Sequence, residues 1–307
     1  MIVLADIDQE RAEIMKGVLR TILRSDLASH VFAQIVDGIP IDSAYEIGTT
    51  RRVDLYSRTH PSQHSVLLAR QFCHSHDIFD SLELNPVVAQ QYQDSTLFST
   101  SFNMHLLELV AIAIHDLAGN LYLIVHPDGR DQVVEVCDDP WVSRELISLS
   151  TMFYCVPSRF PRAFLDVVGY WAEVQIFGGV VVFDRGPEEG KRHCNAAFIH
   201  PRYADGDIFE LSEIQCERFS QLGLHRDSKN DGRKLILPFT PEPDARKVRH
   251  DIAFLRCNIY RDRYEREVTP FRGGCGGTRL VKANDPEMMA IQELIRQQEE
   301  VEKEKDG

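Results

Sequence analysis

The sequence lacks the common signatures of catalysis and nucleotide binding. It contains no CxxC or HExxH metal-binding spacing, no serine-hydrolase motif, no phosphate-binding P-loop and no glycine-rich dinucleotide fingerprint. Each of these motifs sets reacting side chains or backbone N–H groups at a fixed spacing, so their absence argues against the most recognisable enzyme classes. The sequence therefore identifies no catalytic residue and leaves any cofactor unknown.

Excess basic charge is also missing. The chain has 34 Lys and Arg against 47 Asp and Glu, which gives a formal net charge of -13. Nucleic acids and anionic membranes bind basic faces, so we expect neither of them as a partner. The local exception is the group Arg256, Arg261, Arg263 and Arg266. Because Asp262 and Glu265 balance that group, the expected partner is an unidentified protein or small molecule.

Paired cysteines and long apolar runs are missing as well. Seven cysteines are scattered along 307 residues without paired spacing, which is typical of reduced thiols in the cytosol or nucleus. The longest apolar stretch is interrupted by His115 and Asp116, and the segment Met1–Asp6 lacks the basic start of a signal peptide. We therefore expect a soluble protein in the cytoplasm or nucleus.

The distribution of residues predicts an α+β fold. Residues 1–156 have mostly helical patterns, residues 157–284 are rich in β-favouring residues, and residues 285–307 form a charged C-terminal helix or tail. Strands and helices do not alternate as a doubly wound parallel sheet requires, so we expect a small, largely antiparallel sheet with one or two helices. The apolar stripe of the C-terminal segment covers too few turns for a stable coiled coil, which favours a monomer.

Helix signals are concentrated in the first half. Residues 8–36 predict two consecutive helices, with Ser25 or Asp26 capping the second. Asn85–Pro86, and Asp139–Pro140 before a helix through Leu149, each resemble an N-cap followed by proline at the first helical position. The strongest pattern is an apolar series at helical spacing, for which a hairpin turning at residues 118–120 is the alternative: Leu106, Val110, Ile114, Leu117 and Leu121.

The second half contains the densest block of β-favouring residues, between Asp166 and Asp184. Two such runs flank Gly178–Gly179, so the block predicts a β-hairpin or a tightly bent pair of strands at the centre of the fold. The alternative is a helix opened by Pro161, which Gly169 and the β-branched run at 180–182 disfavour. Further on, Ser212 and Gln215 have the spacing of a helix capping box, and residues 252–264 predict a long strand.

A resemblance is carried by this same block. Residues 170–173 read Tyr-Trp-Ala-Glu, and residues 176–186 read Ile-Phe-Gly-Gly-Val-Val-Val-Phe-Asp-Arg-Gly. The block resembles one found in a broad group of fungal proteins that has no assigned activity. The resemblance implies a fungal, intracellular protein and carries over no functional residue.

The candidate binding residues lie in the same block and in one glycine-rich loop. Trp171, Glu173, Asp184 and Arg185 are the polar and aromatic members of the block, and Glu173 is either an acid with a raised pKa or an ion-pair partner of Arg185. We favour the ion pair. Cys275 has glycines on both sides, a setting that can present a thiolate or backbone N–H groups, although a plain connector is the simpler interpretation.

Two groups of histidine and cysteine have metal-binding residue types without metal-binding spacing. The first is Cys73, His74 and His76 with His60 and His64 upstream, and the second is His193 and Cys194 with His200. Neither group has the fixed ligand spacing of a structural zinc site. The sequence analysis therefore predicts no metal. His115 and Asp116 are interpreted as the polar edge of a buried helix rather than as a catalytic dyad.

Two functional hypotheses follow from these observations. The first is an intracellular binding or interaction protein that uses the β-rich half as a scaffold. The second is an enzyme of unfamiliar type that acts on a small molecule in a pocket between the helical half and the sheet. The absence of catalytic motifs favours the first hypothesis.

Overall fold

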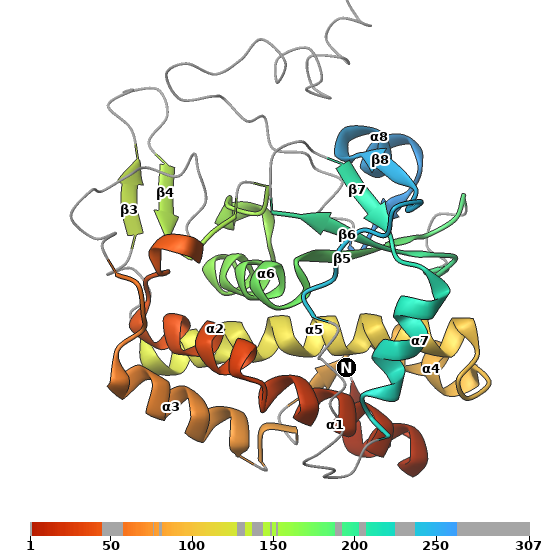
Figure 1. Cartoon of the computed structure of the whole chain (residues 1–307), viewed down its shortest axis with the longest axis horizontal. Coiled ribbons are helices and arrows are strands. Elements are labelled where there is room, and N and C mark those ends of the chain that lie inside the picture. The colour runs from red at the N-terminus through yellow and green to blue at the C-terminus, as the bar shows by residue number, and fades with distance from the viewer. Residues whose placement is uncertain are drawn as a thin grey trace, which may run out of the picture.

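One long helix separates a helical layer from a small antiparallel sheet, as the computed structural model in Figure 1 shows. The structure describes residues 2–44, 58–75, 77–79, 82–127, 133–136, 144–147, 149–151, 153–187, 192–202, 207–224 and 237–262. The helices are α1 Gln9–Leu23, α2 Asp26–Asp37, α3 Gln63–His74, α4 Pro86–Asp94, α5 Thr100–Val125, α6 Phe164–Phe177, α7 Glu213–Gln221 and α8 His250–Arg256. The strands are β1 Ile2–Val3, β2 Glu83–Leu84, β3 Val133–Val136, β4 Arg144–Ile147, β5 Gly179–Asp184, β6 Ala197–Pro201, β7 Asp207–Glu210, β8 Lys247–Arg249 and β9 Ile259–Tyr260.

Several helices of the first half begin where their capping residues predict. The Ser25 hydroxyl accepts a hydrogen bond from the Ala28 N–H at the start of α2. Asn85 accepts from the Val87 N–H before the proline that opens α4. Such caps satisfy N–H groups that the first helical turn leaves without partners. These predicted helix starts are confirmed.

Helix α5 is the centre of the fold. Helices α1 and α2 pack on one side of it, while α6 and the sheet lie on the other (Figure 1). It is long and apolar enough to cross a membrane, but 67% of its most apolar 18-residue window is buried inside the structure. Burial on nearly all sides explains why the helix is apolar around its whole circumference. The prediction of a helix over Leu106–Leu121 is confirmed.

The main sheet has the strand order β8-β7-β6-β5-β9, and every neighbouring pair is antiparallel. Strand β6 is the middle strand, and the residues of its neighbour β5 from Gly179 to Phe183 are all buried. Two further pairs, β1 with β2 and β3 with β4, form separate two-stranded sheets. The predicted α+β fold, with a mostly helical first half followed by a small antiparallel sheet, is confirmed.

The hairpin predicted for residues 166–184 is wrong in its first half. Residues Phe164–Phe177 form helix α6, which ends at Gly178 in the left-handed conformation with φ +87, and only β5 after it is a strand. Helix α6 is buried on nearly every face, so its sequence shows no polar stripe that would indicate a helix. The helical penalty of its valines is about 0.5 kcal/mol each, much less than the roughly 1.5–3 kcal/mol gained by burying each one.

Of four other sequence-based predictions, two are wrong, one is confirmed and one lies outside the described residues. Strand β4 covers Arg144–Ile147, where a helix after Asp139–Pro140 was expected. The long strand expected over residues 252–264 is helix α8 followed by the short strand β9, with Asn258 at φ 53 between them. Asn tolerates this left-handed conformation, which lets the chain turn sharply. The capping box at Ser212 and Gln215 is confirmed, and the predicted C-terminal helix lies outside the described residues.

Candidate functional site

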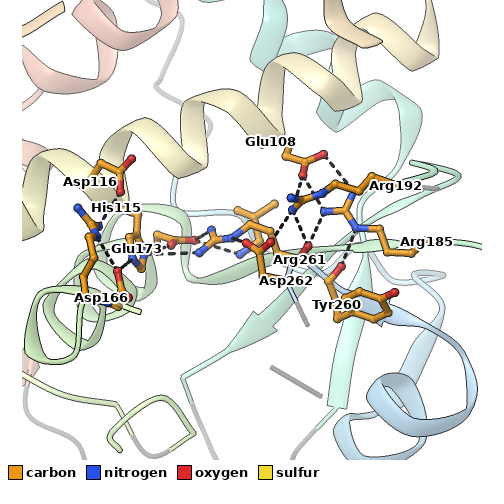
Figure 2. Close-up of polar contacts among 12 residues, drawn as sticks. Glu108, His115, Asp116, Asp166, Glu173, Arg185, Arg192, Tyr260, Arg261 and Asp262 are labelled. Atoms are coloured by element: carbon orange, nitrogen blue, oxygen red, sulfur yellow. Dashed lines mark hydrogen bonds and ion pairs between the residues drawn. The ribbon is translucent and has the colours of Figure 1, made fainter. Parts of the chain in front are cut away.

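Helix α5 carries three buried ionisable residues, His105, Glu108 and His115, and the last two are centres of buried ion pairs. Glu108 and His115 are seven residues apart, which is two helical turns, and their exposed fractions are 0% and 6%. A charge in such a position must be paired, because removal from water costs several kcal/mol per ion. Each residue is the centre of a group of polar contacts, and the two groups lie side by side along α5 (Figure 2).

The first group, the His115 network, joins α5 to α6. His115 Nδ1 lies 2.8 Å from Glu173 Oε1, and Nε2 lies 3.1 Å from Asp166 Oδ1. Both carboxylates come from α6, again seven residues apart and therefore on one face. A protonated imidazole can donate from both nitrogens at once, which matches two carboxylate acceptors. The network consists of His115, Asp116, Arg162, Asp166, Glu173 and Arg261.

The pKa values in this network favour the charged form of His115. Burial lowers the pKa of His115, but the hydrogen bonds to Asp166 and Glu173 outweigh it, so that the net pKa is raised. Burial raises the pKa of Asp166, but the contacts with His115 and Arg162 lower it to about 2. With His115 protonated, three cations face three carboxylates and the network is electrically neutral.

Arg261 completes the environment of Glu173. Its Nη1 donates to Glu173 Oε2 at 2.7 Å, and its guanidinium lies 5.2 Å from the centre of the Tyr170 ring. Both oxygens of Glu173 are therefore paired, one with His115 and the other with Arg261. Arg261 is only 3% exposed, so it does not contribute to a basic surface patch.

The second group, the Glu108 network, joins α5 to the end of β5 and to the segment after β9. Arg185 Nη2 donates to Glu108 Oε1 at 2.7 Å, and Nη1 donates to Oε2 at 3.1 Å. Arg185 also donates to the backbone oxygens of Tyr260 and Arg261. Arg192 pairs with Asp262 at 2.7 Å. Arg261 thus connects the networks, with its side chain in one and its carbonyl oxygen in the other (Figure 2).

The predicted binding residues are brought close together only in part. Trp171 and Glu173 are both 0% exposed within α6, so neither lines an open surface. Asp184 accepts a hydrogen bond from the Gly186 N–H at 2.8 Å and does not join either network's ion pairs. The ion pair predicted between Glu173 and Arg185 is wrong, because Arg185 pairs with Glu108 and Glu173 with Arg261. Cys275 lies outside the described residues.

The important partners that sequence reasoning missed are Glu108, Asp166 and Arg261. One signal was present: Glu108 and His115 are ionisable residues two turns apart in a mostly apolar helix. Asp116, the sequence neighbour of His115, instead pairs with Arg162 at 2.6 Å. The interpretation of His115 and Asp116 as the polar edge of a buried helix rather than a catalytic dyad stays a prediction.

The histidines and cysteines that were grouped by their closeness in the sequence do not all lie together in the structure. His200 lies on β6, where its Nδ1 is hydrogen-bonded to the Tyr154 hydroxyl at 2.9 Å. Cys194, six residues earlier, lies instead beside His105 and Glu108 of α5, and the ligand atoms of these three residues are within 4.8 Å of one another. In the first group, burial raises the pKa of Cys73 to about 12, and residue 76 lies outside the described residues.

Comparison with known proteins gives no further guide to this site. No family model matches the chain, and no curated protein or solved structure is significantly similar to it.

Proposed function

We propose that the protein is a non-catalytic binding protein and that its two buried charge networks are structural. The observation that carries this proposal is that the buried carboxylates are already paired inside the molecule. Glu108 and Glu173 each have both oxygens in contact with cationic groups, and both are 0% exposed. A general acid or base must instead reach a substrate atom directly or through one water.

The partner that we propose is a polypeptide with a basic surface, because the net charge of -13 attracts and steers cationic partners. Nucleic acids and membranes are disfavoured for the same reason. We further propose a monomer in the cytoplasm or nucleus. The alternative, an enzyme acting between the helical half and the sheet, stays a prediction without a supporting contact among the described residues.

The tertiary structure gathers exposed carboxylates near the start of α1. Gln93 accepts a hydrogen bond from the Asp8 N–H at 3.0 Å, and Arg11 donates to the Ser95 carbonyl oxygen at 2.8 Å. These contacts place the end of α4 beside the start of α1. The acidic face defined by this contact consists of Asp6, Asp8, Glu10 and Asp94, all of which are exposed, and Asp8 also pairs with Arg11 at 3.4 Å.

Binding of a fluorescent Lys- and Arg-rich peptide, measured by anisotropy, tests this proposal. We expect saturable binding that weakens between 50 and 200 mM salt, and no binding of an acidic peptide of equal length or of duplex DNA. The variant Glu10→Gln/Asp94→Asn should bind more weakly. Glu242→Gln/Asp244→Asn removes the same two charges from other exposed positions and should bind as wild type does. Equal losses in both variants, or no binding at all, would contradict the proposal.

A further inference from the structure

The group His105, Glu108 and Cys194 combines three kinds of metal-binding atom in one buried place. His105 and Glu108 are three residues apart on α5, so they share a helical face, and their exposed fractions are 5% and 0%. Cys194 approaches from the segment before β6. The imidazole nitrogen, carboxylate oxygen and thiol sulfur lie within 4.8 Å of one another. We propose that these residues form a binding site for a divalent transition-metal ion, and that zinc fits the site best.

The set of ligand atoms supports zinc in particular. Zinc is bound in proteins by Cys sulfur at about 2.3 Å, His nitrogen at about 2.0–2.1 Å and carboxylate oxygen at about 2.0–2.2 Å. Tetrahedral bonds of these lengths separate neighbouring ligand atoms by roughly 3.3–3.8 Å. The observed separations, at most 4.8 Å, therefore exceed these values by no more than about 1.5 Å, which side-chain movements can close. A mixture of nitrogen, sulfur and oxygen disfavours magnesium and calcium, which prefer oxygen alone.

An unpaired nitrogen of His105 is a second observation that points to a bound ligand. Its Nδ1 is buried and has no hydrogen-bond partner among the described residues. Buried polar atoms without partners are rare in folded proteins, and a missing ion is one of their explanations.

Glu108 can hold a metal without giving up Arg185. A carboxylate has about four lone-pair positions, and the bidentate contact with Arg185 occupies one on each oxygen. Arg185 would then act as an outer partner that orients the ligand, as carboxylate ligands in metal sites commonly require. Arg185 Nη1 also donates to the carbonyl oxygen of His193, next to Cys194, so the same side chain holds both ligand segments.

The charges around the group agree with the binding of a divalent ion. The surrounding Glu108, Asp184, Asp262, Arg185 and Arg192 carry one net negative charge. A divalent ion that displaces the Cys194 proton to solvent adds one positive charge in total, which makes the region neutral.

Titration of chelator-treated, full-length protein with Co²⁺, which replaces zinc and absorbs light, tests the site. We expect one equivalent to bind, with a near-ultraviolet sulfur-to-metal charge-transfer band that Zn²⁺ abolishes. Cys194→Ser should remove the band and weaken Zn²⁺ affinity by at least about 100-fold, since even outer-shell changes cost 10–100-fold. His105→Gln should weaken affinity comparably.

Cys73→Ser is the matched control, because Cys73 is also a free thiol shielded from water but lies on α3, outside the group. Its Co²⁺ spectrum and Zn²⁺ affinity should equal those of wild type. Circular dichroism of each variant shows whether it is folded, and Cys194→Ser on its loop decides the test if His105→Gln fails to fold. Absence of a charge-transfer band in wild type, or its persistence in Cys194→Ser, would overturn the proposal.

Discussion

The two networks on α5 neutralise buried carboxylates by different means. In the Glu108 network the cation is the guanidinium of Arg185, which stays charged at every pH at which proteins fold. In the His115 network part of the positive charge is an imidazolium that can lose its proton. The first network is therefore a permanent ion pair, whereas the second is neutral only while His115 remains protonated.

The networks also hold different parts of the molecule together. Arg185 binds three backbone oxygens from two segments, so the Glu108 network attaches the chain after β5 and after β9 to α5. His115 binds two side chains of α6, so its network attaches one helix to another. The Glu108 network thus holds two loop segments against α5, and the His115 network holds α6 against α5. Variants in each network should therefore affect stability differently.

The largest effect is expected from Arg185→Met. This change leaves the Glu108 carboxylate buried without its bidentate partner, which typically costs about 3–5 kcal/mol of unfolding free energy. Urea unfolding followed by circular dichroism measures the loss. The double variant Glu108→Leu/Arg185→Met removes both charges and should recover part of it. A loss below about 1 kcal/mol in the single variant would show that the pair is not a major structural contact.

Gly169→Ala tests the packing of the His115 network. A Cβ at this position of α6 would lie 2.6 Å from the His115 ring, so the imidazole must move away from its carboxylates. Overpacking of this kind costs about 1–3 kcal/mol. In a His115→Ala background the obstacle is absent, and the same Gly169→Ala change should stabilise the protein by up to about 1 kcal/mol through helix propensity. Equal effects in both backgrounds would show that the ring is not confined by α6.

The pH dependence of stability should distinguish the networks. The pKa of His115 is raised on folding, so its stabilisation is complete below its unfolded pKa and is lost as pH rises through the folded value. The pKa of Asp166 is lowered from 3.8 to about 2, so its stabilisation of about 2 kcal/mol is lost as pH falls through that range.

Unfolding free energies measured across pH for wild type, His115→Gln and Asp166→Asn test these assignments. His115→Gln should lose the alkaline dependence, and Asp166→Asn should lose the acid dependence that Asp166 contributes. The Glu108–Arg185 pair should add little dependence near neutral pH, because Arg185 does not titrate there. A wild-type protein whose stability is unchanged on the alkaline side would contradict a protonated His115.

The smallest effect is expected at the partly exposed edge of the His115 network. Arg162 is 32% exposed as a side chain and pairs with Asp116, which is 25% exposed, and with Asp166, which is 10% exposed and also contacts His115. Pairs accessible to water are worth about 0.2–1 kcal/mol. Arg162→Ala should therefore lower the unfolding free energy by no more than about that amount, and added salt should reduce the difference from wild type. A loss of unfolding free energy as large as that of Arg185→Met would show that this partly exposed edge stabilises the protein as much as the buried Glu108–Arg185 pair does.

Local sequence signals predicted the helices that have their own start signals or apolar periodicity. Ser25, Asn85 and Ser212 accept hydrogen bonds from N–H groups within three residues of themselves. The helix starts that they cap can therefore be predicted without knowledge of the fold. The apolar series of α5 predicted a helix for the same reason. An antiparallel sheet in the second half also followed from composition and from the lack of regular alternation between strands and helices.

The tertiary structure decided the state of residues 164–177 and the pairing of the buried charges. Helix α6 has β-favouring residues but is enclosed on nearly all sides, so burial outweighs local propensity and removes the periodic pattern. Glu173 and Arg261 are 88 residues apart, and Glu108 and Arg185 are 77 apart. Local patterns cannot predict such partners, because a carboxylate pairs with whichever cation the packed helices and strands bring beside it.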